Sequence, residues 1–140
     1  MATSTSAAAK RAWVQLRDLV LEDDDPRKRV SNALGITYFK VKVLISLLKH
    51  SESASDLVQR FASDKTYISL ILRDLEVDGS IMRVTSPTDR RSKLIMLTDQ
   101  GRELAKSARS ILDQPPRAFN RLSSDEVNTL LMLIEKIMGK

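Results

Sequence analysis

One stretch of the sequence, residues 65–73, combines basic, hydroxyl and apolar side chains that suit contact with the edges of DNA base pairs. Lysine and arginine can reach guanine acceptors or phosphates, hydroxyl groups can donate or accept hydrogen bonds, and a leucine can contact the methyl group of thymine. If the stretch is helical, the side chains expected to be exposed are Lys65, Thr66, Tyr67, Ser69, Leu70 and Arg73. A polar helix face taken alone, however, usually does no more than face solvent.

A second stretch holds a local excess of positive charge. The chain has a net charge of +5, and its charges nearly balance outside this stretch. Here a single acid, Asp89, is accompanied by Arg83, Arg90, Arg91 and Lys93. A narrow minor groove concentrates negative potential and attracts arginine, so we expect Arg90 and Arg91 to contact it. Asp89 is expected to hold Arg91 extended by an ion pair, although a short basic loop taken alone is usually a solvated surface.

Cap signals and hydrophobic periodicity predict the elements that position both stretches. A short helix is expected from the capping box at 53–56 through Phe61, followed by a tight turn and a longer helix over 65–78. Two β-prone runs, 81–85 and 93–97, then form a hairpin around the basic tip. In a helix-turn-helix the second helix enters the major groove. The order of these elements therefore predicts binding to double-stranded DNA.

Further helices are expected on both sides of this region. A helix over 7–21 should be interrupted at Pro26, and another piece runs to Leu34. Thr98 caps a helix that precedes two prolines, and a last helix carries an apolar stripe. We therefore predict a mainly helical chain with a small β-hairpin wing (α+β), forming a single domain over 1–140.

The composition excludes several other classes of site. The chain has no cysteine and one histidine, His50, which rules out thiolate zinc sites, thiol redox sensing and histidine-rich metal sites. It has no catalytic Ser-His-Asp or Cys-His set and no glycine-rich phosphate loop, so we expect neither an enzyme nor a cofactor. No run approaches the ~18 apolar residues that span a bilayer, and residues 1–9 lack a secretory pattern. We expect a cytoplasmic protein, associated with the nucleoid through DNA and not with a membrane.

Three segments of the sequence resemble the MarR family of bacterial and archaeal regulators. They are Ser55-Asp56-Leu57 through Val84, Asp89-Arg90-Arg91, and Leu97-Thr98-Asp99-Gln100-Gly101. The resemblance covers 36–104 and implies a winged helix-turn-helix lobe over 37–98. It implies that the helix after Asp64 is the recognition helix, that Arg91 enters the minor groove, and that Asp89 orients it.

The resemblance also implies a homodimer in which segments 1–36 and 99–140 of two subunits mainly supply the intertwined helices. The residues expected at this interface are Leu16, Leu130, Leu131, Ile134 and Ile137. Such dimers bind near-palindromic sites with half-sites roughly 34–36 Å apart. The alternative for the last helix is packing within its own subunit.

Many members of the family lose DNA affinity when a small phenolic or anionic effector binds between the dimer helices and the DNA-binding lobe. By resemblance, Trp13, Tyr38 and Lys42 are candidate pocket residues, although apolar aromatic residues at helical spacing more often belong to a core. The chain departs from the family at Leu70, where arginine is common, and at the interruption around Pro26.

The function that these observations favour is a repressor that binds its operator, excludes RNA polymerase and is released by a ligand. The alternative is a winged-helix module used only for protein interaction. Such a module would bind duplex DNA weakly and without regard to sequence.

Overall fold

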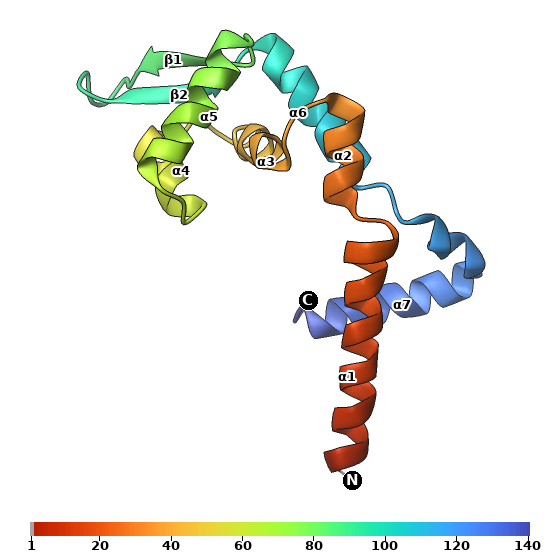
Figure 1. The fold of residues 1–140 in the computed structure, drawn as a ribbon. Coiled ribbons are helices and arrows are strands. Elements are labelled where there is room, and N and C mark those ends of the chain that lie inside the picture. Colours follow the sequence, from red (N-terminus) through yellow and green to blue (C-terminus); the bar gives the residue numbers. More distant parts are fainter. Residues whose placement is uncertain (1) are drawn as a thin grey trace. The chain divides into compact units, whose positions relative to one another are not determined.

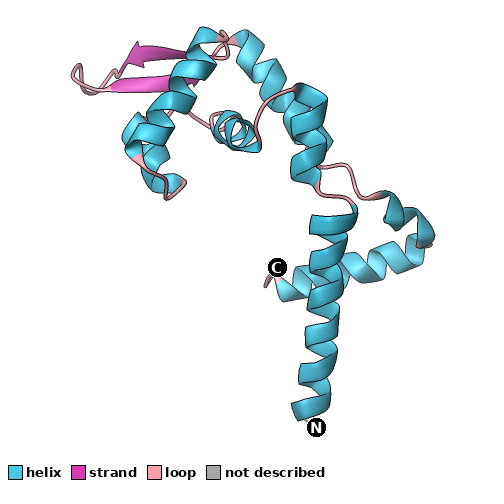
Figure 2. Cartoon of the chain, in the orientation of Figure 1, coloured by secondary structure: helices cyan, strands magenta, loops and turns pink. Residues whose placement is uncertain are grey.

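The computed structural model describes residues 2–140, with side chains from residue 7 onward. It divides into two compact units, each considered by itself: Pro26–Asp113, and Met1–Asp25 together with Gln114–Lys140. Helices dominate both, and among the described residues the only sheet is a two-stranded antiparallel hairpin (Figure 1 and Figure 2). The predicted fold class, mainly helical with a small hairpin wing, is confirmed.

The unit Pro26–Asp113 contains the predicted helix-turn-helix and hairpin. In chain order its elements are α2 (Pro26–Leu34), α3 (Tyr38–Ser46), α4 (Ala54–Arg60), α5 (Lys65–Val77), β1 (Ile81–Thr85), β2 (Lys93–Leu97) and α6 (Asp99–Leu112). Both strands have the predicted bounds. Helices α2, α3 and α6 contact one another in this unit. The sequence prediction instead places α2 and α6 in the dimerisation segments 1–36 and 99–140, and the division of the chain into those segments and a lobe over 37–98 stays a prediction.

The core of this unit is aliphatic, as the scarcity of aromatic residues requires. Helix α5 buries a stripe at three- and four-residue steps, formed by Ile68, Ile71, Leu72 and Leu75. These side chains pack in one cluster with Leu44 of α3 and Leu57 of α4. Each such buried side chain contributes about 1.5–3 kcal/mol by leaving water. One face of α5 is thereby fixed in the core, and its other face is left to solvent.

Side-chain caps fix where the helices of this lobe begin. Asp64 accepts hydrogen bonds from the backbone N–H groups of Thr66 (2.6 Å) and Tyr67 (3.3 Å) at the start of α5. Ser53 and Asp56 form the predicted capping box of α4. These oxygens satisfy N–H groups that have no partner within a helix. The helix-turn-helix therefore begins both of its helices where the sequence predicts.

The Leu-Thr-x-x-Gly segment joins α6 to the turn between α5 and β1. The Thr98 hydroxyl donates to the carbonyl of Gly79 (2.5 Å) and accepts from the N–H of Gly101 (3.0 Å). A Cβ added at Gly101 would lie 1.8 Å from the carbonyl oxygen of Ser80. A glycine is therefore required, because the first turn of α6 lies directly against that backbone.

The hairpin pairs Ile81 with Leu97 at its base and Thr85 with Lys93 at its tip. A third extended segment touches it, because Glu52 and Ile95 form an antiparallel bridge. The N–H of Ile95 donates to the Glu52 carbonyl (2.7 Å), and the N–H of Glu52 donates back (3.3 Å). The wing is thus connected to the chain just before α4.

The other unit consists of α1 (Ala2–Asp18), a π-helical turn η1 (Leu19–Asp23), a 3-10 helix η2 (Arg117–Arg121) and α7 (Ser124–Ile137). Pro26 is the first residue of α2, where a missing N–H costs no hydrogen bond. The predicted interruption before it is confirmed, while η1 and η2 were not predicted. Helix α7 buries none of its residues within the chain.

A membrane-spanning helix and a metal-binding cluster of side chains are both absent from the described residues. None of the helices in the described part of the chain has the length and hydropathy of a membrane span. Within the same residues, no group of three or more histidine, aspartate and glutamate side chains could hold a metal ion.

Candidate nucleic-acid interface

All six predicted contact residues of α5 lie on its solvent-exposed face. They are Lys65, Thr66, Tyr67, Ser69, Leu70 and Arg73. Two of them present apolar surface, since Tyr67 is 41% and Leu70 49% exposed. Within the described residues neither Lys65 nor Arg73 takes part in an ion pair, so both cations are available to an external anion. The face therefore combines hydrogen-bonding, cationic and methyl-contacting groups, as direct readout requires.

Aromatic contacts with neighbouring helices hold the ring of Tyr67 in place. Its ring meets Phe39 of α3 edge-on, with centroids 5.0 Å apart, and Phe39 contacts Phe61 at 5.6 Å. Edge-to-face pairs of this kind are favoured by the charge distribution of the rings. Tyr67 therefore offers its exposed part from a fixed position, which reduces the conformational entropy lost on contact with DNA.

The tip of the hairpin is an internally hydrogen-bonded turn. Ser86, which is buried, accepts from the N–H of Thr88 (3.3 Å) and of Asp89 (3.4 Å). The carboxylate of Asp89 accepts from the N–H of Arg91 (2.9 Å) and the hydroxyl of Ser92 (3.1 Å). The expected ion pair between the side chains of Asp89 and Arg91 is absent from the described interactions. Asp89 shapes the backbone that carries Arg91, because an aspartate two residues before an N–H closes a local turn.

The four basic residues of the hairpin divide into two kinds. Arg83 forms an ion pair with Glu76 of α5 (3.2 Å), and the ammonium of Lys93 donates to Thr85 across the strands (3.0 Å). Within the described residues Arg90 and Arg91 make no side-chain ion pair or hydrogen bond, and both are exposed. The tip therefore presents two cations that DNA phosphates can pair without breaking an existing contact.

Tyr38 and Lys42, two of the candidate pocket residues, line a cavity of about 320 Å³ in this unit. The Lys42 ammonium lies 4.9 Å from the ring centroid of Phe39 and 5.4 Å from that of Phe61. Such contacts between a cation and an aromatic face are attractive. Trp13 belongs to the other unit and is 64% exposed, so its role in a pocket stays a prediction.

The predicted interface residues lie in the other unit and are accessible within a single chain. Leu16 of α1 and Leu131, Ile134 and Ile137 of α7 are exposed, and Leu130 is half-buried. Their apolar surface is left uncovered by their own unit.

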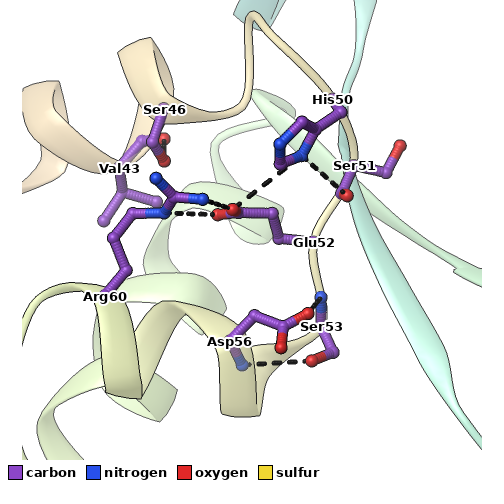
Figure 3. Close-up of polar contacts among 8 residues, drawn as sticks. All are labelled: Val43, Ser46, His50, Ser51, Glu52, Ser53, Asp56 and Arg60. Atoms are coloured by element: carbon purple, nitrogen blue, oxygen red, sulfur yellow. Dashed lines mark hydrogen bonds and ion pairs between the residues drawn. The ribbon is translucent and has the colours of Figure 1, made fainter.

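A polar group that the sequence analysis missed lies beside the helix-turn-helix. Glu52 is only 3% exposed, and Arg60 donates to both of its carboxylate oxygens (Figure 3). His50 stands beside the same carboxylate, with its Nδ1 3.8 Å from the Oε1 of Glu52. Glu52 follows an unpatterned loop, so no local signal showed that it would be buried.

Comparisons with known proteins agree with this geometry. Residues 37–101 match a family model described as a winged helix DNA-binding domain. An uncharacterized HTH-type transcriptional regulator of Bacillus subtilis, YdgJ, is 38% identical over 77 residues, covering 54% of this chain and 46% of that protein. The regulator TcaR of Staphylococcus aureus is 28% identical over 114 residues, 79% of this chain and 75% of its own. The chain spans about half the length of the first curated relatives it matches.

Solved structures share the fold over nearly the whole chain. YusO of Bacillus subtilis superposes with a TM-score of 0.76 at 20% identity and covers 99% of this chain and 97% of its own. A mutant of MarR from E. coli complexed with operator DNA superposes with a TM-score of 0.60 at 26% identity, covering 88% of this chain and 91% of its own. The winged helix-turn-helix architecture is therefore shared with MarR regulators.

Proposed function

We propose that this chain, whose residues 37–101 match a winged helix DNA-binding domain and whose fold is shared with MarR regulators, binds a specific double-stranded DNA sequence and thereby regulates transcription. The observation that carries this proposal is the presence, in one compact unit, of an exposed readout face on α5 and two unpaired arginines at the hairpin tip. The MarR structure whose title records operator DNA has the same fold. No catalytic role is proposed, and such a regulator works in the cytoplasm, on the nucleoid.

In this proposal α5 reads the major groove. Lys65 and Arg73 supply cations, Thr66, Tyr67 and Ser69 supply hydroxyl groups, and Leu70 contacts a thymine methyl group. Arg90 and Arg91 enter the flanking minor groove, and Lys93 and Asp89 keep the tip in shape. The contacts on phosphate fix position, and those on base edges give sequence preference.

The DNA-bound form is proposed to be a homodimer. Ile137 is 80% exposed within the single chain, and Leu16, Leu131 and Ile134 add to the uncovered apolar surface. An apolar helix face that is exposed in this way is typical of a surface that binds another protein chain. A second copy covers it with the same residues, because a two-fold interface uses one patch twice.

The regulator is proposed to act as a repressor that a small phenolic or anionic effector releases. The cavity beside Tyr38 and Lys42 contains no acidic side chain, and it is also lined by Lys49, Arg60 and Arg109. An effector can change DNA affinity only as far as it prefers one arrangement of the recognition helices over another.

Selection from random duplexes tests this function against the alternative, a module for protein interaction. A sequence-specific dimer should enrich near-palindromic sites with half-sites about one duplex turn apart. A protein-interaction module should enrich none. The Arg91→Ala variant, selected in parallel, should lose preference for the flanking positions and keep the preference read by α5.

A further inference from the structure

Arg60 is the side chain on which this inference rests, because it belongs to two features at once. It donates to both carboxylate oxygens of the buried Glu52, with its Nε at 3.2 Å from Oε2. It also lines the basic cavity together with Lys42, Lys49, His50 and Arg109. Its side chain is about half exposed, whereas that of Glu52 is 3% exposed. A molecule in the cavity can therefore reach the guanidinium that Glu52 holds.

Glu52 connects the hairpin to the helix-turn-helix. Its backbone bridges Ile95 of β2 through two hydrogen bonds. Its side chain binds Arg60, the last residue of α4, directly before the turn that leads to α5 (Figure 3). In that turn Ala62 has a φ of 45°, a conformation that L residues rarely adopt. The pair therefore holds the C-terminal end of α4, and with it the approach to α5, against the wing strand.

The cavity has the chemistry of an anion site. Lys42, Lys49, Arg60 and Arg109 bring positive charge to it, and no aspartate or glutamate is among its lining residues. Tyr38, Phe61 and Leu112 supply apolar surface. A planar carboxylate matches the two-point fork of arginine better than a neutral ligand does. A small aromatic or aliphatic carboxylate satisfies both the charge and the apolar walls.

We propose that a small carboxylate bound in this cavity competes with Glu52 for the guanidinium of Arg60 and so loosens the link between the wing and the helix-turn-helix. The guanidinium exchanges one carboxylate partner for another. Glu52 is then left buried without its arginine partner, which is unfavourable for a charged group. Ligand binding and the Glu52–Arg60 link therefore oppose each other. The consequence for DNA rests on the proposed function, while the competition itself does not.

The test is the affinity of the DNA-free, full-length protein for benzoate, measured by titration calorimetry in three variants. Glu52→Gln removes the competing charge and should tighten benzoate binding about fivefold or more. Arg60→Gln removes the shared donor and should weaken it about tenfold or more, as expected for a charge-assisted bidentate contact. Arg102→Gln, an exposed arginine of α6 outside the cavity, should leave the affinity unchanged. Benzamide, the neutral analogue, should not bind.

Opposite shifts in the first two variants support the proposal, because a purely structural pair would weaken binding in both. Weaker or unchanged benzoate binding by Glu52→Gln overturns it, as does the absence of binding to both the natural protein and this variant. If Arg60→Gln does not fold, Arg60→Lys replaces it. Lysine keeps the charge without the fork, so benzoate binding should still weaken about threefold or more.

A separate titration distinguishes failure of the competition from failure of DNA binding. Benzoate should lower the affinity of the natural protein for its DNA and have no effect on the Arg60 variant, and the reverse coupling must be equal in size. Opposite benzoate shifts in a protein that binds no DNA would remove the proposed function alone. Specific DNA binding without the opposite shifts would remove the competition alone.

Discussion

Replacement of Arg91 by alanine is the sharpest test of the wing, because no residue in the described part of the chain pairs with this side chain. Its N–H is held by the carboxylate of Asp89 at 2.9 Å, so the backbone of the tip should survive the change. A hydrogen bond to a charged group contributes about 1.5–3 kcal/mol. A dimer carrying the change twice should therefore bind its DNA at least a hundredfold more weakly.

The salt dependence of DNA affinity gives a second, independent measure of what Arg91 contributes. Each phosphate charge neutralised contributes about 0.9 to the slope of log affinity against log salt. If each Arg91 neutralises one phosphate, the slope should fall by about two units for the dimer. Anisotropy titrations of a labelled duplex at roughly 0.1–0.3 M salt, a range around physiological ionic strength, measure the affinity and its salt dependence together.

Arg83→Ala is the matched control for this change. Its side chain is already paired with Glu76 at 3.2 Å, and an exposed pair of this kind contributes little. The control should change affinity less than threefold and leave the salt slope unchanged. Equal effects of the two variants, or an unchanged slope for Arg91→Ala, would refute the assignment of the tip arginine to the minor groove.

Three further predictions concern the scaffold and the dimer. Gly101→Ala should lower the free energy of unfolding by about 1–3 kcal/mol or more in a denaturant titration, because its Cβ would meet the Ser80 backbone at 1.8 Å; Ser107→Ala, at an exposed position of the same helix, is the control and should change it by less than about 0.5 kcal/mol, and an equal loss in both would remove the close-packing argument. Asp64→Ala should cost about 1 kcal/mol of stability by removing the cap of α5, whereas Asp64→Asn should cost less; an unchanged melting curve for alanine would contradict the cap. Ile134→Glu should shift the protein from dimer to monomer in sedimentation equilibrium while Asn128→Glu, on the same helix, does not; a dimer that survives the first change would show that the face is not the interface.

The sequence predicts the elements of the DNA-binding lobe well because their signals are local. Asp64 and Thr98 lie directly before the helices they cap, and the hairpin strands are bounded by Gly79 and the polar tip. The buried stripe of α5 follows from spacing alone. Each of these features is determined within one or two turns of chain, so a short window of residues suffices to predict it.

What the sequence does not predict depends on contacts between separate elements. Glu52 is buried where its backbone bridges Ile95, more than forty residues later, and where Arg60 binds its carboxylate, and no neighbouring residue in the sequence reveals these contacts. The prediction of an ion pair between the side chains of Asp89 and Arg91 was wrong because it, too, depended on the folded arrangement of the tip. The same carboxylate could bind either a guanidinium or the local N–H groups, and only the closed shape of the tip selects the latter. The π turn at Leu19–Asp23 has no compositional signal.

Specific recognition of duplex DNA is the central claim, and a fluorescence-anisotropy titration on DNA from upstream of the protein's own gene tests it most directly. The measurement uses physiological salt and a scrambled duplex of equal length and composition. Binding about a thousandfold tighter than to the scrambled duplex is the predicted result, within the range of specific regulators. If a site obtained by selection from random duplexes is also bound no more tightly than its scrambled form, the claim is contradicted and a winged-helix module for protein interaction takes its place.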